Sequence, residues 1–350
     1  MRDGDERTRP DQRRATKENA GRLSSGLLAT VVLVGAVSLA RPADASPWIL
    51  KKGSIVVGLN AGGQFARKEF LPDGKLQRFP LRGAADNYFL EVGGRYGLGG
   101  GFEISARTLL KGISYQSDAV LLPGNPPPKT LAENRAAVFD FSQRAVGLAD
   151  IYVGLGYQHL KKPLRLASSL ELKFPTGYRK PRETFNQGTP APDRIGDDVT
   201  LGDGQVDLQY KLELGVFIRA TRSVLQLDAG YRARFNGPGH QAIGQIKIGQ
   251  MIGRFLLLYA AVNGARTVFD GEVIGKSYIA VNPDVLAKDY AGTDIKEVEL
   301  TLDRDFVEVS GGAILRFARR EWVLRVAHTV LGKNYSQLTS VSIGMLISFR

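Results

Sequence analysis

The sequence predicts an all-β fold, an antiparallel up-and-down transmembrane β-barrel of about twelve strands. Three observations lead to this prediction. Long segments alternate apolar and polar residues with a period of two, their connections are alternately short and long, and charged side chains keep to one strand face. A wall between lipid and water needs these properties, because successive strand residues point to opposite faces and only one face meets hydrocarbon.

The N-terminus has the features of a secretory signal peptide. A basic residue precedes an apolar run at 26–40, and an A-x-A triplet that ends at Ala45 follows it. The run is short for a transmembrane helix, although an uncleaved membrane anchor is the alternative. We therefore expect residues 1–45 to be a signal peptide with a hydrophilic leader, cleaved between Ala45 and Ser46. Residues 46–350 are expected to form a single barrel domain.

The composition narrows the chemistry that the chain can perform. Its 350 residues include no cysteine, which excludes thiolate metal sites, thiol catalysis and disulfides. The formal net charge is +12. A basic chain often binds nucleic acid, but an exported chain meets little of it. We expect the surplus charge to contact acidic headgroups of outer-membrane lipids, with no nucleic-acid partner.

The strands are expected in order along residues 46–350. The first, 54–65, begins soon after the predicted cleavage site and leaves no room for an N-terminal plug domain. Period-two alternation predicts eleven more strands, three of them within 147–219. The others are expected at 87–98, 101–115, 224–235, 242–252, 255–268, 306–317, 322–331 and 341–349.

The connections alternate between short and long along the chain. Short turns are expected near Gly99, Lys161, Thr221, Gly253 and Arg319. Outer-membrane barrels have short periplasmic turns and longer extracellular loops, and an even number of strands returns both termini to the periplasm. Residues 135–141 and 296–302 also alternate. We expect them to extend neighbouring strands above the membrane, with a barrel of fourteen strands as the alternative.

Charged residues on the expected strands, apart from 255–268, fall on the polar face. A charge that faces the middle of the bilayer costs about 2–4 kcal/mol, so a barrel wall should show this segregation. A soluble β-sandwich would show the same alternation, with the apolar face buried in a core. The candidate lumen-lining residues are Glu91, Arg95, Glu103, Arg107, Lys111, Asp150, Arg165, Glu171, Lys173, Asp207, Lys211, Glu213, Asp228, Arg232, Arg234, Glu308, Arg316 and Arg325.

Aromatic residues help to separate these alternatives, because they fall at strand ends on the apolar face. Membrane barrels have two aromatic girdles, one at each interface between lipid and water. One expected girdle consists of Tyr96, Phe102, Tyr157, Phe317, Trp322 and Phe349, and the other of Phe65, Tyr88, Phe174 and Phe235. Together with the signal peptide and the loop asymmetry, they favour the outer membrane of a diderm (Gram-negative) bacterium.

The last expected strand has a second property typical of such barrels. Its apolar face alternates from Val341 to Phe349 and ends in an aromatic residue. This pattern resembles the C-terminal signal that the barrel-assembly machinery recognises, which makes that machinery an expected partner. The chain departs from the usual form by one residue, because Arg350 follows the phenylalanine.

Four motifs together resemble a known family. They are GLADIYVGLGYQ (147–158), LELKFPTG (170–177), LGDGQVDLQYKLELG (201–215) and HTVLGKN (328–334). In this order and spacing they resemble the outer-membrane barrel family named for a putative meta-pathway of phenol degradation. The resemblance covers most of residues 46–350. It implies a transporter-like barrel that handles small, often aromatic, solutes.

Charged residues near the expected outer mouth suggest a constriction. Asp150, Lys173 and Asp207 lie at strand ends and point inward, so they form either a selective constriction or an ion-pair ladder that only stabilises the wall. A second group of four arginines can line a path that favours anions, as rings of basic residues do in anion pores. These are Arg107, Arg232, Arg234 and Arg325. Acidic residues are interspersed among them, so strong anion selectivity is not implied.

Catalysis is the competing class of function, and the sequence gives it little support. The three histidines are His159, His240 and His328, and none belongs to a zincin, hydrolase or P-loop motif. The acidic residues Asp193, Asp197, Asp198 and Asp203 do not have the spacing of an EF-hand. We therefore expect no enzyme, metal or cofactor, with an outer-membrane hydrolase as the remote alternative.

The expected function is passive passage of small, possibly aromatic or hydrophobic, solutes across the outer membrane. A polar interior, long outer loops and the lack of a plug domain support it. A barrel of about twelve strands lies between small filled barrels and open porins, so bulky side chains can also close it. The alternative is a sealed barrel that is structural or binds a surface partner.

Overall fold

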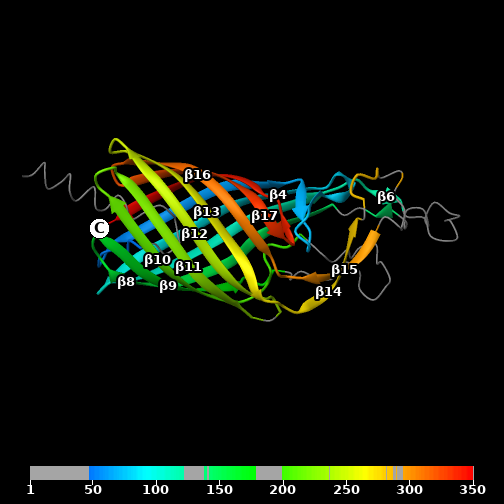
Figure 1. Ribbon diagram of the computed structural model, residues 1–350, viewed down its shortest axis with the longest axis horizontal. Coiled ribbons are helices and arrows are strands. Elements are labelled where there is room, and N and C mark those ends of the chain that lie inside the picture. The colour runs from blue at the N-terminus through cyan, green and yellow to red at the C-terminus, as the bar shows by residue number, and fades with distance from the viewer. Residues whose placement is uncertain are drawn as a thin grey trace, which may run out of the picture.

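The computed structural model describes residues 47–121, 138–139, 142–178, 199–235, 237–280, 282–286, 289 and 295–349. Twelve antiparallel strands close into one barrel (Figure 1). They are β1 (Ile55–Ala66), β4 (Ala84–Gly99), β5 (Phe102–Gln116), β8 (Gln143–Leu160), β9 (Leu164–Pro175), β10 (Asp207–Ile218), β11 (Ser223–Arg234), β12 (His240–Ile252), β13 (Leu256–Phe269), β16 (Asp305–Phe317), β17 (Arg320–Lys333) and β19 (Thr339–Phe349). The prediction of an all-β barrel of about twelve strands is confirmed.

The first and last strands close the barrel. β1 pairs with β19 from Ile55 opposite Phe349 to Phe65 opposite Thr339, and its other edge pairs with β4. Lipid offers no partner for backbone N–H and C=O groups, so a spanning sheet must close on itself. The short connections and the C-terminus lie at one end of the barrel, which we call the inner end (Figure 1).

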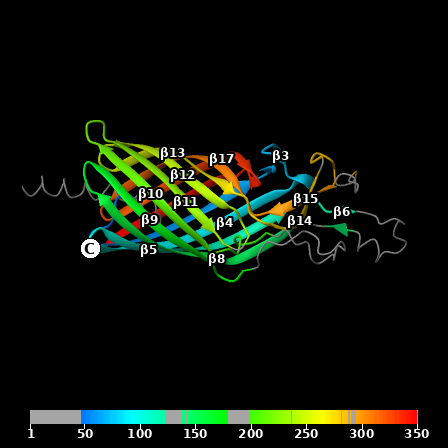
Figure 2. The same ribbon diagram turned by 60° about the horizontal axis from the view of Figure 1, so that its bottom comes forward.

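Short elements extend the opposite end, which we call the outer end (Figures 1 and 2). A small sheet consists of β18 (Tyr335–Ser336), β2 (Lys68–Phe70) and β3 (Leu76–Arg78). The 3₁₀ turn η1 (Pro80–Arg82) follows β3 in the sequence. β14 (Val273–Ala280) pairs with β15 (Ile295–Thr301), and β6 (Val120–Leu121) pairs with β7 (Val138–Phe139).

The pairing in these small sheets shows whether the barrel wall has twelve or fourteen strands. Residues 296–301 belong to β15, which pairs with β14 and not with the barrel. Val138 and Phe139 pair only with β6, and the rest of 135–141 lies outside the described residues. The alternative of fourteen strands is therefore wrong. The expectation that these segments extend barrel strands is also wrong, because they pair in sheets of their own.

The two faces of the wall differ as a membrane barrel requires. On β12, Ile246 is 54% exposed, whereas its neighbour Gln245 is 7% exposed. All ten aromatic residues of the expected girdles are exposed on the outside. The eighteen candidate lumen-lining residues are all buried or half-buried. The fold is that of an outer-membrane β-barrel, with an apolar outer face and a polar inner face.

The apolar core lies inside the barrel at its inner end. Trp48 is 3% exposed and belongs to a cluster of buried side chains whose other members come from seven strands. The other members are Val56, Val224, Met251, Leu257, Ile314, Val323 and Leu346. The residues just before β1 themselves enter the lumen.

Several predictions about the termini lie beyond the described residues. Ala45, Ser46 and the leader before them are outside these ranges, so the signal peptide and its cleavage site stay predictions. Recognition of β19 by the assembly machinery also stays a prediction. Within the described ranges, no helix combines the length and apolarity needed to cross a membrane.

Opposite faces of β12 should respond differently to the same substitution. Ile246→Arg places a charge against lipid and should lower the free energy of unfolding by about 2–4 kcal/mol. Gln245→Arg, one residue away, faces the polar lumen and should cost less than half as much. Urea unfolding in lipid vesicles measures both values. Equal losses for the two variants would contradict the assigned orientation of the wall.

Candidate functional site in the barrel lumen

A polar cavity occupies the lumen between the inner core and the outer end. Its volume is about 570 Å³, and the described residues that line it include eight Lys or Arg and six Asp or Glu. The lining comes from strands all around the barrel, because alternate residues of every strand point inward. Four aromatic side chains share this lining, namely Phe89, Tyr152, Tyr259 and Phe306.

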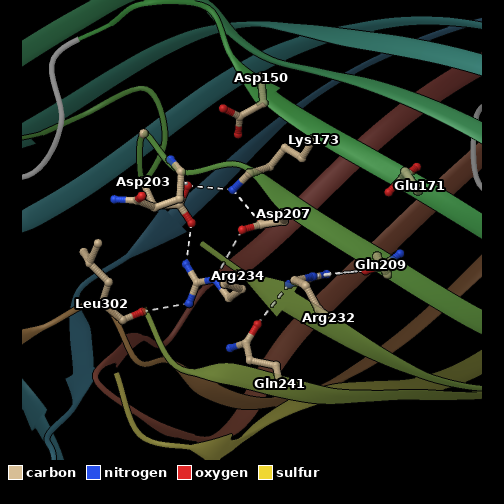
Figure 3. Close-up of polar contacts among 12 residues, drawn as sticks. Asp150, Glu171, Lys173, Asp203, Asp207, Gln209, Arg232, Arg234, Gln241 and Leu302 are labelled. Carbon is tan, nitrogen blue, oxygen red and sulfur yellow. Dashed lines mark hydrogen bonds and ion pairs between the residues drawn. The ribbon is translucent and has the colours of Figure 1, made fainter. Parts of the chain in front are cut away.

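Four charged residues form a network of ion pairs at the outer end of this cavity. Lys173 of β9 lies 2.6 Å from Asp203 and 2.7 Å from Asp207. Arg234 of β11 lies 2.5 Å from Asp203 and 3.6 Å from Asp207 (Figure 3). We call these four residues the outer lock. Asp203 belongs to the chain segment before β10, so the ion pairs of the outer lock hold that segment at the outer end of the cavity.

Two further contacts hold the same segment in place. Lys111 Nζ donates a hydrogen bond to the carbonyl of Leu201 at 3.0 Å. Arg234 donates a second hydrogen bond to the carbonyl of Leu302, just before β16, at 3.1 Å. The outer lock therefore joins the connection between β9 and β10 to the one between β13 and β16. Leu201 and Leu302 are both buried.

Asp150 takes a different partner from the one expected. The hydroxyl of Tyr178 donates to Asp150 at 2.5 Å and accepts from the N–H of Gly204 at 3.0 Å. A side chain at Gly202 would collide with the Tyr178 hydroxyl, so any larger residue there would displace this tyrosine. Burial and the bond to Asp150 raise the pKa of Tyr178, which keeps the donating proton on its oxygen. Of the expected constriction, only Lys173 and Asp207 pair directly.

The middle of the lumen holds further ion pairs between strands. Arg107 lies 3.2 Å from Glu171 and 3.7 Å from Glu91, and its guanidinium stacks 3.8 Å above the Tyr152 ring. Arg325 of β17 pairs with Glu308 of β16. Opposite charges on adjacent strands stabilise a sheet, so these contacts support the wall as well as lining the lumen.

Other predicted lumen residues make weaker or more local contacts. Lys211 lies 3.7 Å from Glu213, which accepts a hydrogen bond from Ser169 at 3.0 Å. Gln226 donates to both carboxylate oxygens of Asp228 at 2.9 Å. Toward the inner end, Arg316 lies 3.1 Å from Glu321, a partner that the sequence analysis did not include. Arg165 is half-buried at the inner end of β9.

The chain segment before β1 closes the inner end. We call Pro47–Leu50 the N-terminal segment. The side chain of Gln158 donates to the Pro47 carbonyl at 2.8 Å, and Glu103 accepts from the N–H of Leu50 at 2.8 Å. Arg95 pairs with Glu103 at 2.6 Å and also donates to the Trp48 carbonyl at 3.2 Å. Charged residues and apolar packing thus hold this segment together.

The histidines contact hydroxyl groups on the outside of the barrel. His159 lies 2.9 Å from Ser168, His240 2.5 Å from Tyr231 and His328 2.8 Å from Thr339. Each contact is exposed, and no carboxylate bonds to these histidines among the residues that the structure describes. A hydrolytic triad needs a group that orients its base, and none is present there. The described residues also contain no cluster of metal ligands, and Asp193, Asp197 and Asp198 lie outside them.

Comparison with known proteins places the fold but not a family. No family model matches the chain, and no curated protein is similar to it in sequence. The structure is similar to an outer-membrane channel from Pseudomonas putida F1, with a TM-score of 0.56 and 10% identity over 86% of this chain and 97% of that one. At this identity the likeness concerns the fold alone. The resemblance to the phenol meta-pathway family stays a prediction.

Two more distant solved structures are also similar. The monoaromatic hydrocarbon channel CymD has a TM-score of 0.41 and 9% identity, covering 86% of this chain and 90% of its own. The translocator domain of the autotransporter NalP from Neisseria meningitidis has a TM-score of 0.40 and 11% identity, covering 96% and 97%.

The outer lock should stay closed over the physiological pH range. Burial alone would raise the pKa of Asp203, but Lys173 and Arg234 outweigh it and hold the pKa at about 2, below the ordinary 3.8. A carboxyl whose pKa is lowered by folding stabilises the fold fully above its ordinary pKa and loses that effect as the pH falls through the lowered value. The lock should therefore persist from pH 8 to pH 4 and open only near pH 2.

A spin label can test this pH dependence, because the chain has no cysteine to compete for it. A label at Val199→Cys should keep the same mobility from pH 8 to pH 4. Asp203→Asn should raise that mobility throughout, whereas Asp73→Asn in an exposed outer turn should leave it unchanged. A label that becomes mobile near pH 5 would contradict the role assigned to Asp203.

Proposed function

We propose that the protein is a passive outer-membrane channel for small solutes, with small aromatic compounds as the first class to test. The observation that supports this function is the polar cavity of about 570 Å³ inside a closed wall. Ligand sites for small molecules commonly have volumes in this range, with polar groups among apolar ones. The four aromatic residues of the lining and the predicted family resemblance favour aromatic solutes.

The N-terminal segment determines whether a solute can leave the cavity toward the periplasm. It lies in the lumen and joins β1 through only a few residues, so it can move without breaking the barrel wall. Hydrogen bonds with the side chains of Gln158, Arg95 and Glu103 hold it in place. We infer that passage requires this segment to swing away from the inner end.

The alternative function is a sealed barrel that is structural or binds a surface partner. Close packing at the inner end favours it, since Trp48 is 3% exposed and Arg95 is 2% exposed. The two functions differ in one respect. A channel needs the N-terminal segment to move, whereas a sealed barrel needs it to stay.

A cysteine pair can fix the N-terminal segment in place. A Cβ atom at Gly156 would lie 2.9 Å from Cδ1 of Ile49, so the two positions are neighbours, and Ile49→Cys with Gly156→Cys is the pair to oxidise, with mass spectrometry to verify that the disulfide forms. Liposomes containing the refolded barrel should take up phenol-sized aromatics when the pair is reduced and at least about tenfold more slowly when it is oxidised. Each single cysteine variant is the matched control.

The uptake assay separates the outcomes. Trp48→Ala removes the largest side chain of the segment and should speed uptake by severalfold. Equal uptake with the disulfide open and closed would mean that solutes do not pass the N-terminal segment. No uptake by any folded variant, Trp48→Ala included, would overturn the channel and favour the sealed barrel.

A further inference from the structure

Among the four arginines predicted to line an anion path, one differs from the others in its partners. Arg107, Arg234 and Arg325 each contact a carboxylate. Arg232 contacts only the amide oxygens of two glutamines among the described residues. It donates to Gln209 Oε1 through Nε at 3.1 Å and Nη2 at 2.8 Å, and to Gln241 Oε1 through Nη1 at 3.1 Å (Figure 3).

Neutral partners leave the charge of Arg232 uncompensated by any contact. An amide oxygen accepts hydrogen bonds but cancels no charge, and a guanidinium stays protonated at any physiological pH. Arg232 is half-buried and lines the cavity, where water screens its charge less than bulk solvent does. A cation held in this way attracts an anion from the cavity.

The hydrogen bonds of Arg232 also leave suitable donors. A guanidinium carries five N–H groups, one on Nε and two on each terminal nitrogen. The bonds to Gln209 and Gln241 use one N–H on each of the three nitrogens. One N–H on each terminal nitrogen therefore remains. Free N–H groups of a guanidinium are strong donors to the oxygens of a carboxylate.

The two glutamines hold Arg232 in position for such a ligand. Gln209 comes from β10 and Gln241 from β12, on either side of Arg232 in β11. Gln241 also donates to the carbonyl of Arg304 at 2.7 Å, which ties it to the segment before β16. Both terminal nitrogens are thus anchored, so little side-chain entropy is lost on binding.

The rest of the lining favours a small organic acid over an inorganic anion. The described lining has two more basic than acidic residues and includes four aromatic rings. We infer that Arg232 is the docking point for the carboxylate of a small, preferably aromatic, organic acid inside the lumen. The inference deepens the proposed function, because the acid must reach the cavity, but binding and passage are measured separately.

Calorimetric titration of the folded barrel in detergent with benzoate tests the inference. Wild-type protein should bind benzoate, and neutral benzamide of the same shape should bind at least about tenfold more weakly, as expected for loss of a charge-assisted pair. Arg232→Gln should weaken benzoate binding by a similar factor. Arg232→Lys should recover only part of it, because a lysine does not offer the planar donor group of a guanidinium.

A second substitution keeps Arg232 and the shape of the site. Gln209→Glu places a carboxylate where Arg232 already has an acceptor, so it should stabilise the barrel while weakening benzoate binding about tenfold. Gln245→Glu adds the same charge to another cavity glutamine and should weaken binding less. Arg254→Gln, at an exposed inner turn, should leave binding unchanged.

The outcomes distinguish this inference from the channel function. Absence of benzoate binding to wild type, or equal binding by wild type and Gln209→Glu, would overturn the assignment of Arg232. Benzoate binding that depends on Arg232 without any uptake in liposomes would uphold the site and reject passage. Uptake of neutral aromatics without benzoate binding would uphold the channel and reject the site.

Discussion

The closed hydrogen-bonding pattern of the wall is the constraint on which the rest of the structure depends. In lipid an unpaired strand edge leaves a row of N–H and C=O groups without partners, so β1 must meet β19. In the closed wall, alternate residues of each strand face outward to lipid and inward to the lumen. The outward set has to be apolar. The inward set can carry charge, and these residues line the polar cavity.

Much of the charge inside this narrow barrel is compensated, and the lumen does this in two ways. Several basic residues meet carboxylates on the next strand, as Arg325 does with Glu308. Others are compensated by chain segments that fold back into the barrel, as Asp203 does for Lys173 and Arg234. The same contacts hold these segments at the outer end of the cavity, so compensation of charge and placement of the segments have the same structural cause.

The sequence predicted the wall well and the two closures poorly. Alternation along a strand is a local property, so residues such as Gln245 and Ile246 reveal their faces without knowledge of the fold. Trp48, Tyr178 and Asp203 lie in irregular segments, where no periodicity indicates direction. The sequence places Asp203 only in an acidic loop. Its partners depend on strand adjacency and on loop conformation, which single-sequence patterns do not contain.

The two ends of the lumen close by different physical means, and this difference bears on which solutes suit the barrel. The outer lock consists of ion pairs, which are directional and which other charged groups can replace. The inner end packs Trp48 among aliphatic side chains, and such packing is non-directional and proportional to apolar area. On the proposed function, a solute meets charged groups first and an apolar barrier last. A small aromatic acid matches both environments, with its carboxylate for the cavity and its ring for the inner end.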